Sequence, residues 1–219
     1  MDSFDQMILI NKPVGWTSFD VVNKLRFKLK IKKIGHAGTL DPLASGLLIL
    51  CTGKMTKRID EFQAQEKEYT GKFIIGKSTS SHDLETEIIE TKDIAGITDD
   101  QIYLAAKKLT GVIQQIPPLH SAIKVDGKRA YKLARKGSDL ELKPREVTVS
   151  QFEITHIQKP EIHFRIVCSK GTYIRSLARD FGNDLGVGAY LTGLCRTRIG
   201  EYKLEDALTL DQINPALPV

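Results

Sequence analysis

The sequence contains little cysteine and no long apolar run, and both absences narrow the class of protein. Its three cysteines, Cys51, Cys168 and Cys195, are an odd set without C-x-x-C spacing, which suggests neither a disulfide framework nor a zinc site. The apolar run 47–50 is far too short to span a bilayer, and the first residues lack the basic segment of a signal peptide. We therefore expect a cytoplasmic protein with reduced thiols, no membrane association and no bound metal.

Several familiar motifs of nucleotide-binding proteins and hydrolases are also missing. No G-x-G-x-x-G is present, Gly53-Lys54 lacks the Walker glycine because position 48 is leucine, and Ser45 is not in G-x-S-x-G. No internal repeat, low-complexity segment or change of composition marks a linker between domains. The 219 residues, of which 41% are hydrophobic, are therefore expected to form a single domain over residues 1–219.

The positive charge of the chain is concentrated in two segments. The chain has 32 Lys and Arg against 27 Asp and Glu, a net charge of +5. Residues 24–33 hold six cations. A second cluster comprises Lys124, Lys128, Arg129, Lys132, Arg135 and Lys136. A solvated face is the ordinary explanation of either cluster alone, but two clusters flanking candidate chemistry favour an RNA partner.

The pattern of apolar residues predicts a strand over residues 7–10 and then a helix that Thr17 or Ser18 begins. Apolar residues recur at helical spacing at Val21, Leu25 and Leu29. Basic and apolar residues also alternate strictly over 24–30, which is the pattern of a strand, so the helix could end early and lead into a basic-faced strand.

The rest of the chain alternates between predicted strands and helices, and the whole pattern indicates a mixed α+β fold. We expect a strand over 66–76, a polar loop over 77–83, a strand over 87–90 and a helix that is capped by Thr98 and Gln101 and ends at Gly111. A hairpin of 121–125 and 128–131 around Asp126-Gly127 and a short helix that closes at Gly137 should follow. The last predicted elements are an antiparallel pair over 147–157 and 162–168, a helix that Thr172 caps and that carries an apolar stripe from Ile174 to Leu185, and a strand within 189–202.

The segment from Gly35 to Gly46 is the densest motif of the chain, with three glycines around one Asp-Pro pair. Glycines at this density allow the backbone to approach a ligand closely. Taken alone, however, an aspartate such as Asp41 before Pro42 is more often a turn-former than a nucleophile. The spacing by itself therefore leaves the role of Asp41 open.

The sequence Gly35-His-Ala-Gly-Thr-Leu-Asp-Pro-Leu-Ala-Ser-Gly-Leu-Leu48 resembles the catalytic motif of the TruB pseudouridine synthases. Further segments that resemble motifs of this family are 11–18, 67–69, 116–131 and 169–177, so the likeness covers most of positions 8–200. The resemblance implies a pseudouridine synthase fold, with a mixed, mostly antiparallel central sheet flanked by helices. It also implies a monomeric catalytic domain without cofactor, metal or obligate protein partner, which acts on the T-arm of tRNA.

The resemblance assigns catalytic roles to three residues. Asp41 is the catalytic carboxylate, and an aspartate with a reference pKa of about 3.9 is already anionic at neutral pH. Arg175 pairs with Asp41 and keeps it ionised despite burial. Tyr69 stacks on the target base and is a candidate proton relay. A core tyrosine is the alternative for Tyr69, but the neighbouring Lys67 and Glu68 argue for an exposed strand end.

Six further residues match substrate-binding positions of the family: Lys12, Pro13, His36, Asp83, Tyr173 and Leu194. Other positions depart from the family's pattern. The loop 79–86 keeps Thr79 and Asp83, but Ser80 and Thr86 replace the usual acid and glycine. His120 stands where Tyr or Phe is common, and Cys195 stands where Arg is common. We expect these changes to affect the conformation of the loop and to remove one phosphate contact.

The predicted reaction is the isomerisation of a T-loop uridine of tRNA, at the position numbered 55, to pseudouridine. Two other functions are considered. An RNA-guided ribosomal RNA synthase of the dyskerin type shares the aspartate motif but relies on a PUA domain, which is not expected here because the sequence stops at Val219. A tRNA chaperone without chemistry is disfavoured because Asp41, Tyr69 and Arg175 are all present.

Overall fold

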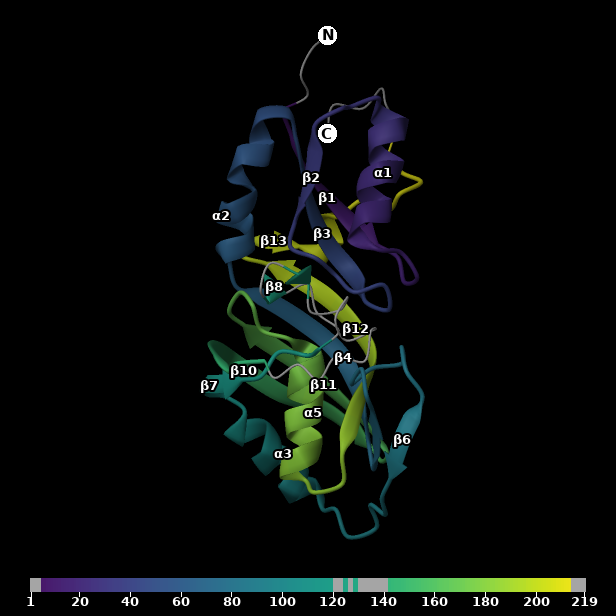
Figure 1. Ribbon diagram of the computed structural model, residues 1–219, viewed down its shortest axis with the longest axis vertical. Coiled ribbons are helices and arrows are strands. Elements are labelled where there is room, and N and C mark those ends of the chain that lie inside the picture. The colour runs from purple at the N-terminus through teal and green to yellow at the C-terminus, as the bar shows by residue number, and fades with distance from the viewer. Residues whose placement is uncertain (1–4, 120–123, 126–127, 130–141, 214–219) are drawn as a thin grey trace. The chain divides into compact units, whose positions relative to one another are not determined.

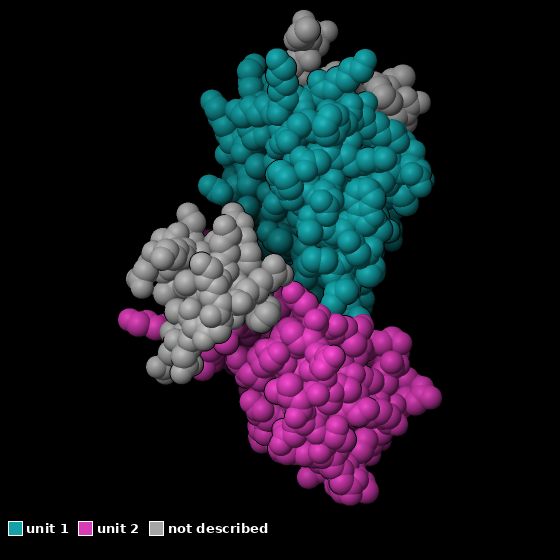
Figure 2. Space-filling view, turned by 45° about the vertical axis from the view of Figure 1, so that its right-hand side comes forward, with its two compact units in different colours: residues 1–70, 193–219 teal, residues 71–192 magenta. Residues whose placement is uncertain are grey.

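The computed structural model describes residues 5–119, 124–125, 128–129 and 142–213 (Figure 1). The chain divides into two compact units, which Figure 2 distinguishes by colour: unit 1 comprises residues 1–70 and 193–219, and unit 2 comprises residues 71–192. Strands β4 (Lys67–Ile75) and β12 (Ala189–Ile199) each begin in one unit and end in the other. The expected single catalytic domain over residues 1–219 stays a prediction.

Unit 1 is organised around the strand β3 (Ser45–Thr52). β3 pairs antiparallel with β1 and β2 and parallel with β12. The other elements of the unit are β1 (Met7–Lys12), α1 (Ser18–Leu29), β2 (Ile34–Ala37), the 3₁₀ helix η1 (Gly53–Arg58), α2 (Ile59–Ala64), β13 (Tyr202–Lys203) and the 3₁₀ helix η2 (Leu204–Asp206).

Both faces of β3 are buried, which explains why its sequence is a continuous apolar run rather than an alternating one. Leu48 and Leu50 belong to the core cluster that includes residues of α1. Leu47 and Ile49 point to the opposite face and pack in the cluster that contains Phe62 of α2. α1 and α2 therefore cover opposite faces of these strands (Figure 1).

Helix α1 continues to Leu29, so the helical prediction is confirmed and the alternative strand over 24–30 is wrong. Val21, Val22 and Leu25 are buried on one helical face, and this burial stabilises the helix more than the local alternation of charges favours a strand. Thr17, one of the two predicted cap residues, caps the helix, and it forms a capping box with Asp20.

Unit 2 contains the strand order β4, β11, β10, β7, in which β10 pairs antiparallel with β11 and with β7. Its elements are β5 (Lys77–Thr79), β6 (Ile88–Thr91), α3 (Asp99–Lys108), β7 (Gly111–Gln115), β8 (Lys124–Val125), β9 (Lys128–Arg129), β10 (Arg145–Gln158), β11 (Glu161–Cys168) and α5 (Ile174–Asp184). The α+β fold with a mixed, mostly antiparallel sheet is confirmed.

The predicted antiparallel pair is present as β10 and β11, and the Thr98–Gln101 capping box begins α3. β8 pairs with β9, which confirms the hairpin in part. Four predicted features lie outside the described residues: the turn at 126–127, the helix predicted to close at Gly137, His120 and half of the second basic cluster. β5 stands within the segment predicted as a polar loop.

Four phenylalanines, which come from four different elements, form the aromatic centre of unit 2. Phe73 of β4 stacks on Phe164 of β11, with ring centroids 4.2 Å apart. Phe152 of β10 and Phe181 of α5 contact the same group, with centroids 5.9 Å apart. Phe181 belongs to the predicted apolar stripe of α5, which is buried as expected. Helices α3 and α5 lie side by side in this unit (Figure 1).

The prediction that Thr172 caps α5 is wrong. The N-cap is Tyr173, which makes no capping bond with its side chain. The Thr172 hydroxyl instead donates to the carbonyl of Ser169 at 3.0 Å. A hydroxyl three residues after a carbonyl can close the preceding turn as readily as it can cap the following helix, and local sequence does not distinguish the two.

Gly46 provides a test of how closely β3 and β12 approach each other. Its φ is +104°, and an added Cβ would lie 2.4 Å from the carbonyl oxygen of Arg196. Gly46→Ala should therefore lower the free energy of unfolding by about 3 kcal/mol or more, through strain at positive φ and a backbone clash. Gly15→Ala is the matched control because Gly15 has a φ of +85° with nothing within 4 Å, and strain alone should cost about 1–2 kcal/mol. Equal losses in urea unfolding would contradict this packing.

Candidate active site

Asp41 lies in a turn between β2 and β3. The amide of Ala44 donates to the carbonyl of Asp41 at 3.1 Å, so residues 41–44 form a β-turn with Pro42 in its second position, where proline is favoured. The side chain of Asp41 is half-buried. The turn-forming reading of the Asp-Pro pair is therefore correct, and it is compatible with a chemical role because the turn fixes the backbone of Asp41.

The residues on both sides of Asp41 are held by the first residue of α1 and by the loop that precedes this helix. The Ser18 hydroxyl accepts a hydrogen bond from the amide of Leu40 at 2.9 Å and donates to the carbonyl of Leu40 at 3.3 Å. The amide of Gly15 donates to the carbonyl of Pro42 at 2.7 Å. These bonds fix the backbone immediately before and after Asp41, which is the preorganisation that a catalytic carboxylate needs.

Lys12 is fully buried beneath this loop. Its Nζ donates to the carbonyls of Pro13 at 2.9 Å, Trp16 at 2.6 Å and Pro42 at 3.5 Å. Burial lowers the pKa of Lys12 to about 8, the negative charge of Asp41 raises it, and the positive charge of Arg196 lowers it. The predicted substrate-binding residue Lys12 thus contacts backbone carbonyls of its own chain and places a cation near Asp41.

Arg196 is a residue of this site that the sequence reasoning missed. It is 1% exposed and its Nε donates to the carbonyl of Leu47 at 2.7 Å. Its other nitrogens reach the carbonyls of Thr39 at 3.5 Å and Gly38 at 3.4 Å, so it holds the segment that leads to Asp41. An arginine in a strand whose flanking residues are largely apolar was the available signal.

Three other predicted substrate residues of unit 1 lie around this loop. His36 stands in β2 opposite Leu50. Burial lowers the pKa of the His36 imidazole, a hydrogen bond to the backbone of Gly38 raises it, and the Arg196 charge lowers it, so the neutral ring is favoured. Pro13 is half-buried at the end of β1. The carbonyl of Leu194 accepts from the Ser45 hydroxyl at 3.4 Å.

The burial of Tyr69 corrects one argument made from the sequence. Tyr69 is 8% exposed, and its neighbour Lys67 is 6% exposed. The Nζ of Lys67 donates to the carbonyls of Gln63 and Gln65. The expectation that Lys67 and Glu68 mark an exposed strand end is therefore wrong for Lys67, because a lysine can be buried when backbone carbonyls surround its ammonium group.

In unit 2, the structure brings Asp83 and Arg175 together. The Nε of Arg175 lies 3.5 Å from Oδ2 of Asp83, and the two side chains are 4% and 6% exposed. Arg175 also donates to the carbonyl of Ser81 at 3.5 Å. The predicted pairing of Arg175 with Asp41 joins residues of different units and stays a prediction.

Tyr173 is positioned by a side chain that the sequence reasoning did not select. Gln115, at the end of β7, accepts from the amide of Tyr173 at 2.8 Å and donates to its carbonyl at 3.1 Å. Gln115 is 1% exposed. The paired bonds fix the backbone at the start of α5, two residues before Arg175.

The loop 79–86 has an ordered arrangement of hydroxyl groups. Ser80 and Thr86, the two departures from the family's pattern, are hydrogen-bonded to each other at 3.0 Å. The Thr86 hydroxyl also accepts from the amide of Ser81 at 3.0 Å. Between them, His82 has a φ of 61°, and burial and the charges of Arg179 and Arg175 lower its pKa to about 4.

With this geometry described, comparison with known proteins identifies the family. The model of the TruB family pseudouridylate synthase N-terminal domain matches residues 26–174, and that of the tRNA pseudouridylate synthase B C-terminal domain matches residues 175–218. The chain belongs to the TruB family. The resemblance that the motifs indicated is thereby confirmed.

Curated relatives of TruB type match nearly the whole chain. A tRNA pseudouridine synthase B of Flavobacterium johnsoniae is 52% identical, with 97% of this chain and 96% of the relative covered. A protein of the same name from Streptomyces avermitilis is 46% identical over 98% of this chain and 74% of the relative. Among solved structures, the crystal structure of a Cbf5-Nop10-Gar1 complex matches with a TM-score of 0.75 and 32% identity, and the match covers 95% of this chain and 53% of the solved one.

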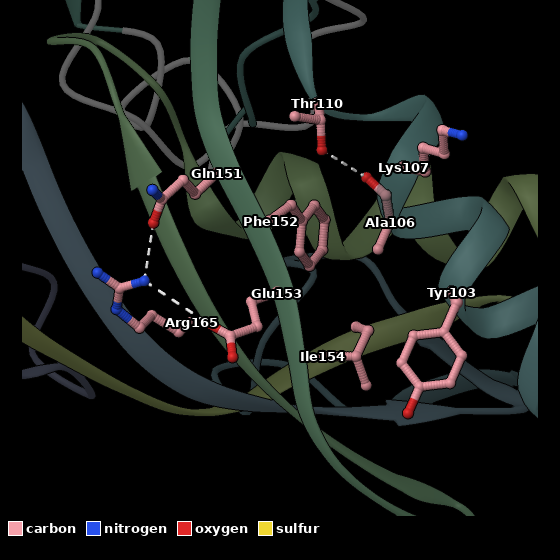
Figure 3. Close-up of a pocket in the computed structure, with 9 residues that line it drawn as sticks. All are labelled: Tyr103, Ala106, Lys107, Thr110, Gln151, Phe152, Glu153, Ile154 and Arg165. Atoms are coloured by element: carbon pink, nitrogen blue, oxygen red, sulfur yellow. Dashed lines mark hydrogen bonds and ion pairs between the residues drawn. The ribbon is translucent and has the colours of Figure 1, made fainter.

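A cavity of about 660 Å³ lies elsewhere in unit 2, beside α3, β10 and β11 (Figure 3). Its lining residues are Tyr103, Ala106, Lys107, Thr110, Gln151, Phe152, Glu153, Ile154 and Arg165. No predicted TruB site residue is among them. Arg165 already donates to Gln151 at 2.8 Å and lies 3.5 Å from Glu153, so this cation of the lining is already paired.

Two searches of the described residues were negative. No cluster of three or more His, Cys, Asp or Glu side chains suited to a metal ion occurs among them. In the same residues, no helix is both long and apolar enough to cross a membrane.

The buried ammonium group of Lys12 predicts a stability difference that depends on pH. Lys12→Met removes three donors from buried carbonyls and should lower the free energy of unfolding by about 1–3 kcal/mol at pH 7. The pKa of Lys12 is about 8 in the folded chain, below its ordinary value of 10.5. Between these values the unfolded chain binds more protons, so Lys12 contributes more stability as the pH rises.

The gap between the wild-type protein and Lys12→Met should therefore widen from pH 8 to pH 10 in urea unfolding. Burial raises the pKa of Cys51 to about 11, but this titration is common to both proteins and cancels. Lys57→Met, at an exposed lysine of η1, should cause no such change. A gap that stays constant across this range would contradict the lowered pKa.

The ion pair of Arg175 and Asp83 predicts a loss of stability when one partner is neutralised. Asp83→Asn leaves the Arg175 charge buried and should lower the free energy of unfolding by about 3 kcal/mol. The control is Asp180→Asn, because Asp180 pairs with Arg179 of the same helix at 2.8 Å with side chains 21% and 26% exposed. Asp180→Asn should lower the free energy of unfolding by less than about 1 kcal/mol. A loss below 1 kcal/mol for Asp83→Asn would show that the buried pair is not a stabilising contact.

Proposed function

We propose that this chain isomerises a uridine of tRNA, at the T-loop position numbered 55, to pseudouridine, with Asp41 as the catalytic carboxylate. The observation that carries the proposal is the set of hydrogen bonds that fixes the turn at Asp41. Its backbone is held on both sides by Ser18 and Gly15, and the buried cation of Lys12 lies near the carboxylate. Membership of the TruB family and the names of the relatives support the same activity.

The proposed reaction rearranges bonds without any net oxidation or reduction. The Asp41 carboxylate adds either to the anomeric carbon of the target nucleotide or to the uracil ring. In both routes the bond from N1 to the sugar breaks, the base turns, and C5 forms the new bond to the sugar. The bond between the Asp41 carboxylate and the substrate also breaks, so the free carboxylate is regenerated. C5 then loses a proton while N1 gains one, so atoms and charge balance and neither a cofactor nor a metal is required.

The surrounding residues are proposed to position the substrate and the carboxylate. Arg175 holds Asp41 ionised and oriented through its planar guanidinium group. Tyr69 stacks on the target base, which is worth about 1–3 kcal/mol, and is the candidate proton relay. The uridine must leave the stack of the folded T-loop to reach Asp41, at a cost of a few kcal/mol.

Substrate binding is proposed to rest on six residues and on the phosphates of the T-arm. Lys12 acts indirectly, by holding the loop that carries Asp41. The others are Pro13, His36, Asp83, Tyr173 and Leu194. The substrate is the T-arm of tRNA, and the enzyme is proposed to act as a monomer without an obligate protein partner.

The RNA-guided synthases are the second candidate function, since one solved relative comes from a Cbf5-Nop10-Gar1 complex. This chain spans only 53% of that relative but 96% of a tRNA pseudouridine synthase B at 52% identity. The tRNA reading is therefore favoured. Incubating the purified chain with an unmodified tRNA transcript, without guide RNA, and mapping pseudouridine chemically distinguishes the two functions and also tests a chaperone without chemistry.

Asp41→Asn should reduce turnover by more than about a thousandfold, as expected for a residue that takes part in bond making. Affinity for tRNA should stay within a few-fold, because phosphate contacts and stacking supply most of the binding. Asp60→Asn, at an exposed aspartate of α2, is the matched control and should retain the wild-type rate. Pseudouridine formation by Asp41→Asn above the background rate would falsify the assignment.

A further inference from the structure

Helix α1 presents an aromatic ring to solvent on a strongly basic surface. Phe27 is 82% exposed, the highest value among the large apolar side chains of the described residues. Placing a phenylalanine ring in water is unfavourable, and the core of unit 1 does not require it, because the buried face of α1 consists of other residues. The ring therefore indicates a binding surface.

The surface around Phe27 carries several exposed lysines. Exposed lysines flank it in the sequence, and within the described part of the chain none of them forms an ion pair. These lysines are Lys24, Lys30, Lys32 and Lys33. No acidic residue occurs between Asp20 and Asp41. Lys28 is different, since its Nζ donates to the carbonyl of Leu210 at 3.0 Å.

We propose that Phe27 and these four lysines form a binding site for an unpaired nucleotide of RNA, with the base stacked on Phe27 and the phosphates near the lysines. Aromatic rings among cations are the usual means by which proteins hold single-stranded nucleic acid, because every base has a face that can stack. The inference rests on the proposed function only for its choice of tRNA as the natural RNA.

The site is separate from the pocket for the target uridine. Ser18, the first residue of α1, touches the backbone of Leu40 beside Asp41. Phe27 follows Ser18 by nine residues, which corresponds to about 13 Å along the helix axis at 1.5 Å per residue. A nucleotide stacked on Phe27 is therefore a different nucleotide from the one that reaches Asp41.

The observations favour RNA over a lipid surface. A helix that lies on a membrane buries a wide apolar face in it, but the apolar face of α1, which includes Val21, Val22 and Leu25, is already buried in unit 1. Two rings of α1 remain exposed, Phe19 at 57% and Phe27 at 82%, and Phe27 is the one with lysines around it. This arrangement suits one stacked base and its phosphates.

The stacking is tested directly with Phe27→Trp, whose indole can stack and reports on it by fluorescence. A ten-nucleotide single-stranded uridine RNA should quench the added tryptophan emission, measured as the difference from the wild-type protein, which retains Trp16. A fully paired RNA duplex of the same length should quench it much less. Equal quenching by both RNAs, or none by either, would overturn the proposed stacking.

The contribution to affinity is tested with Phe27→Ala and an unmodified tRNA transcript. The Kd should rise about tenfold, within the range for one stacked base, while Phe27→Trp should stay within twofold of wild type. Tyr103→Ala is the control, since Tyr103 is an aromatic residue of α3 that is 53% exposed, and its Kd should not change. Replacing the four lysines with glutamine should reduce the salt dependence of binding.

Failure of the proposed RNA site at Phe27 can be distinguished from failure of the proposed synthase function. At saturating tRNA, Phe27→Ala should keep the kcat of the wild-type protein, because Phe27 does not contact the reacting nucleotide. If the wild-type protein forms no pseudouridine, the proposed function fails while the quenching still tests the surface. If Phe27→Ala weakens binding to vesicles with anionic lipids but not to RNA, the surface is a lipid site and the proposal is overturned.

Discussion

The backbone around Asp41 depends on two buried cations that hydrogen-bond to carbonyl groups. Lys12 donates to three carbonyls and Arg196 reaches three more, so together they hold the loop before α1, the turn at Asp41 and the start of β3. A buried carbonyl without a partner costs about 1–3 kcal/mol. The two cations therefore help to satisfy these carbonyls, and Lys12 does so close to the carboxylate of Asp41.

Burying these cations also has an electrostatic cost. Burial is the largest cause of the lowered pKa of Lys12, and the charge of Arg196 adds to it, while only the charges of Asp41 and Asp20 oppose them. The carboxylate of Asp41 thus favours the charged form of Lys12, which holds its own loop. Structural and chemical roles are combined in the same residues, and a substitution at any of them is expected to change both stability and the geometry of the site.

Local patterns in the sequence predicted most of the fold but little of what holds the site together. The capping boxes at Thr17 and Thr98 and the apolar stripe of α5 depend on residues a few positions apart, and all are present. Arg196 and Gln115, in contrast, act on residues far away in the chain, and no local pattern records such contacts. The burial of Lys67 was missed for a different reason, since its partners Gln63 and Gln65 are close in the chain but accept through backbone carbonyls, which side-chain patterns do not record. The roles of Asp41, Tyr69 and Arg175 were available only from resemblance to a family.

The hydroxyl pair in the loop 79–86 has a consequence for how this sequence can diverge from its relatives. Ser80 and Thr86 replace the acid and the glycine that are usual at these positions, and they bond to each other. A glycine at position 86 would remove the partner of the Ser80 hydroxyl and also the acceptor of the Ser81 amide. The residue that can be accommodated at position 86 therefore depends on the residues at positions 80 and 81.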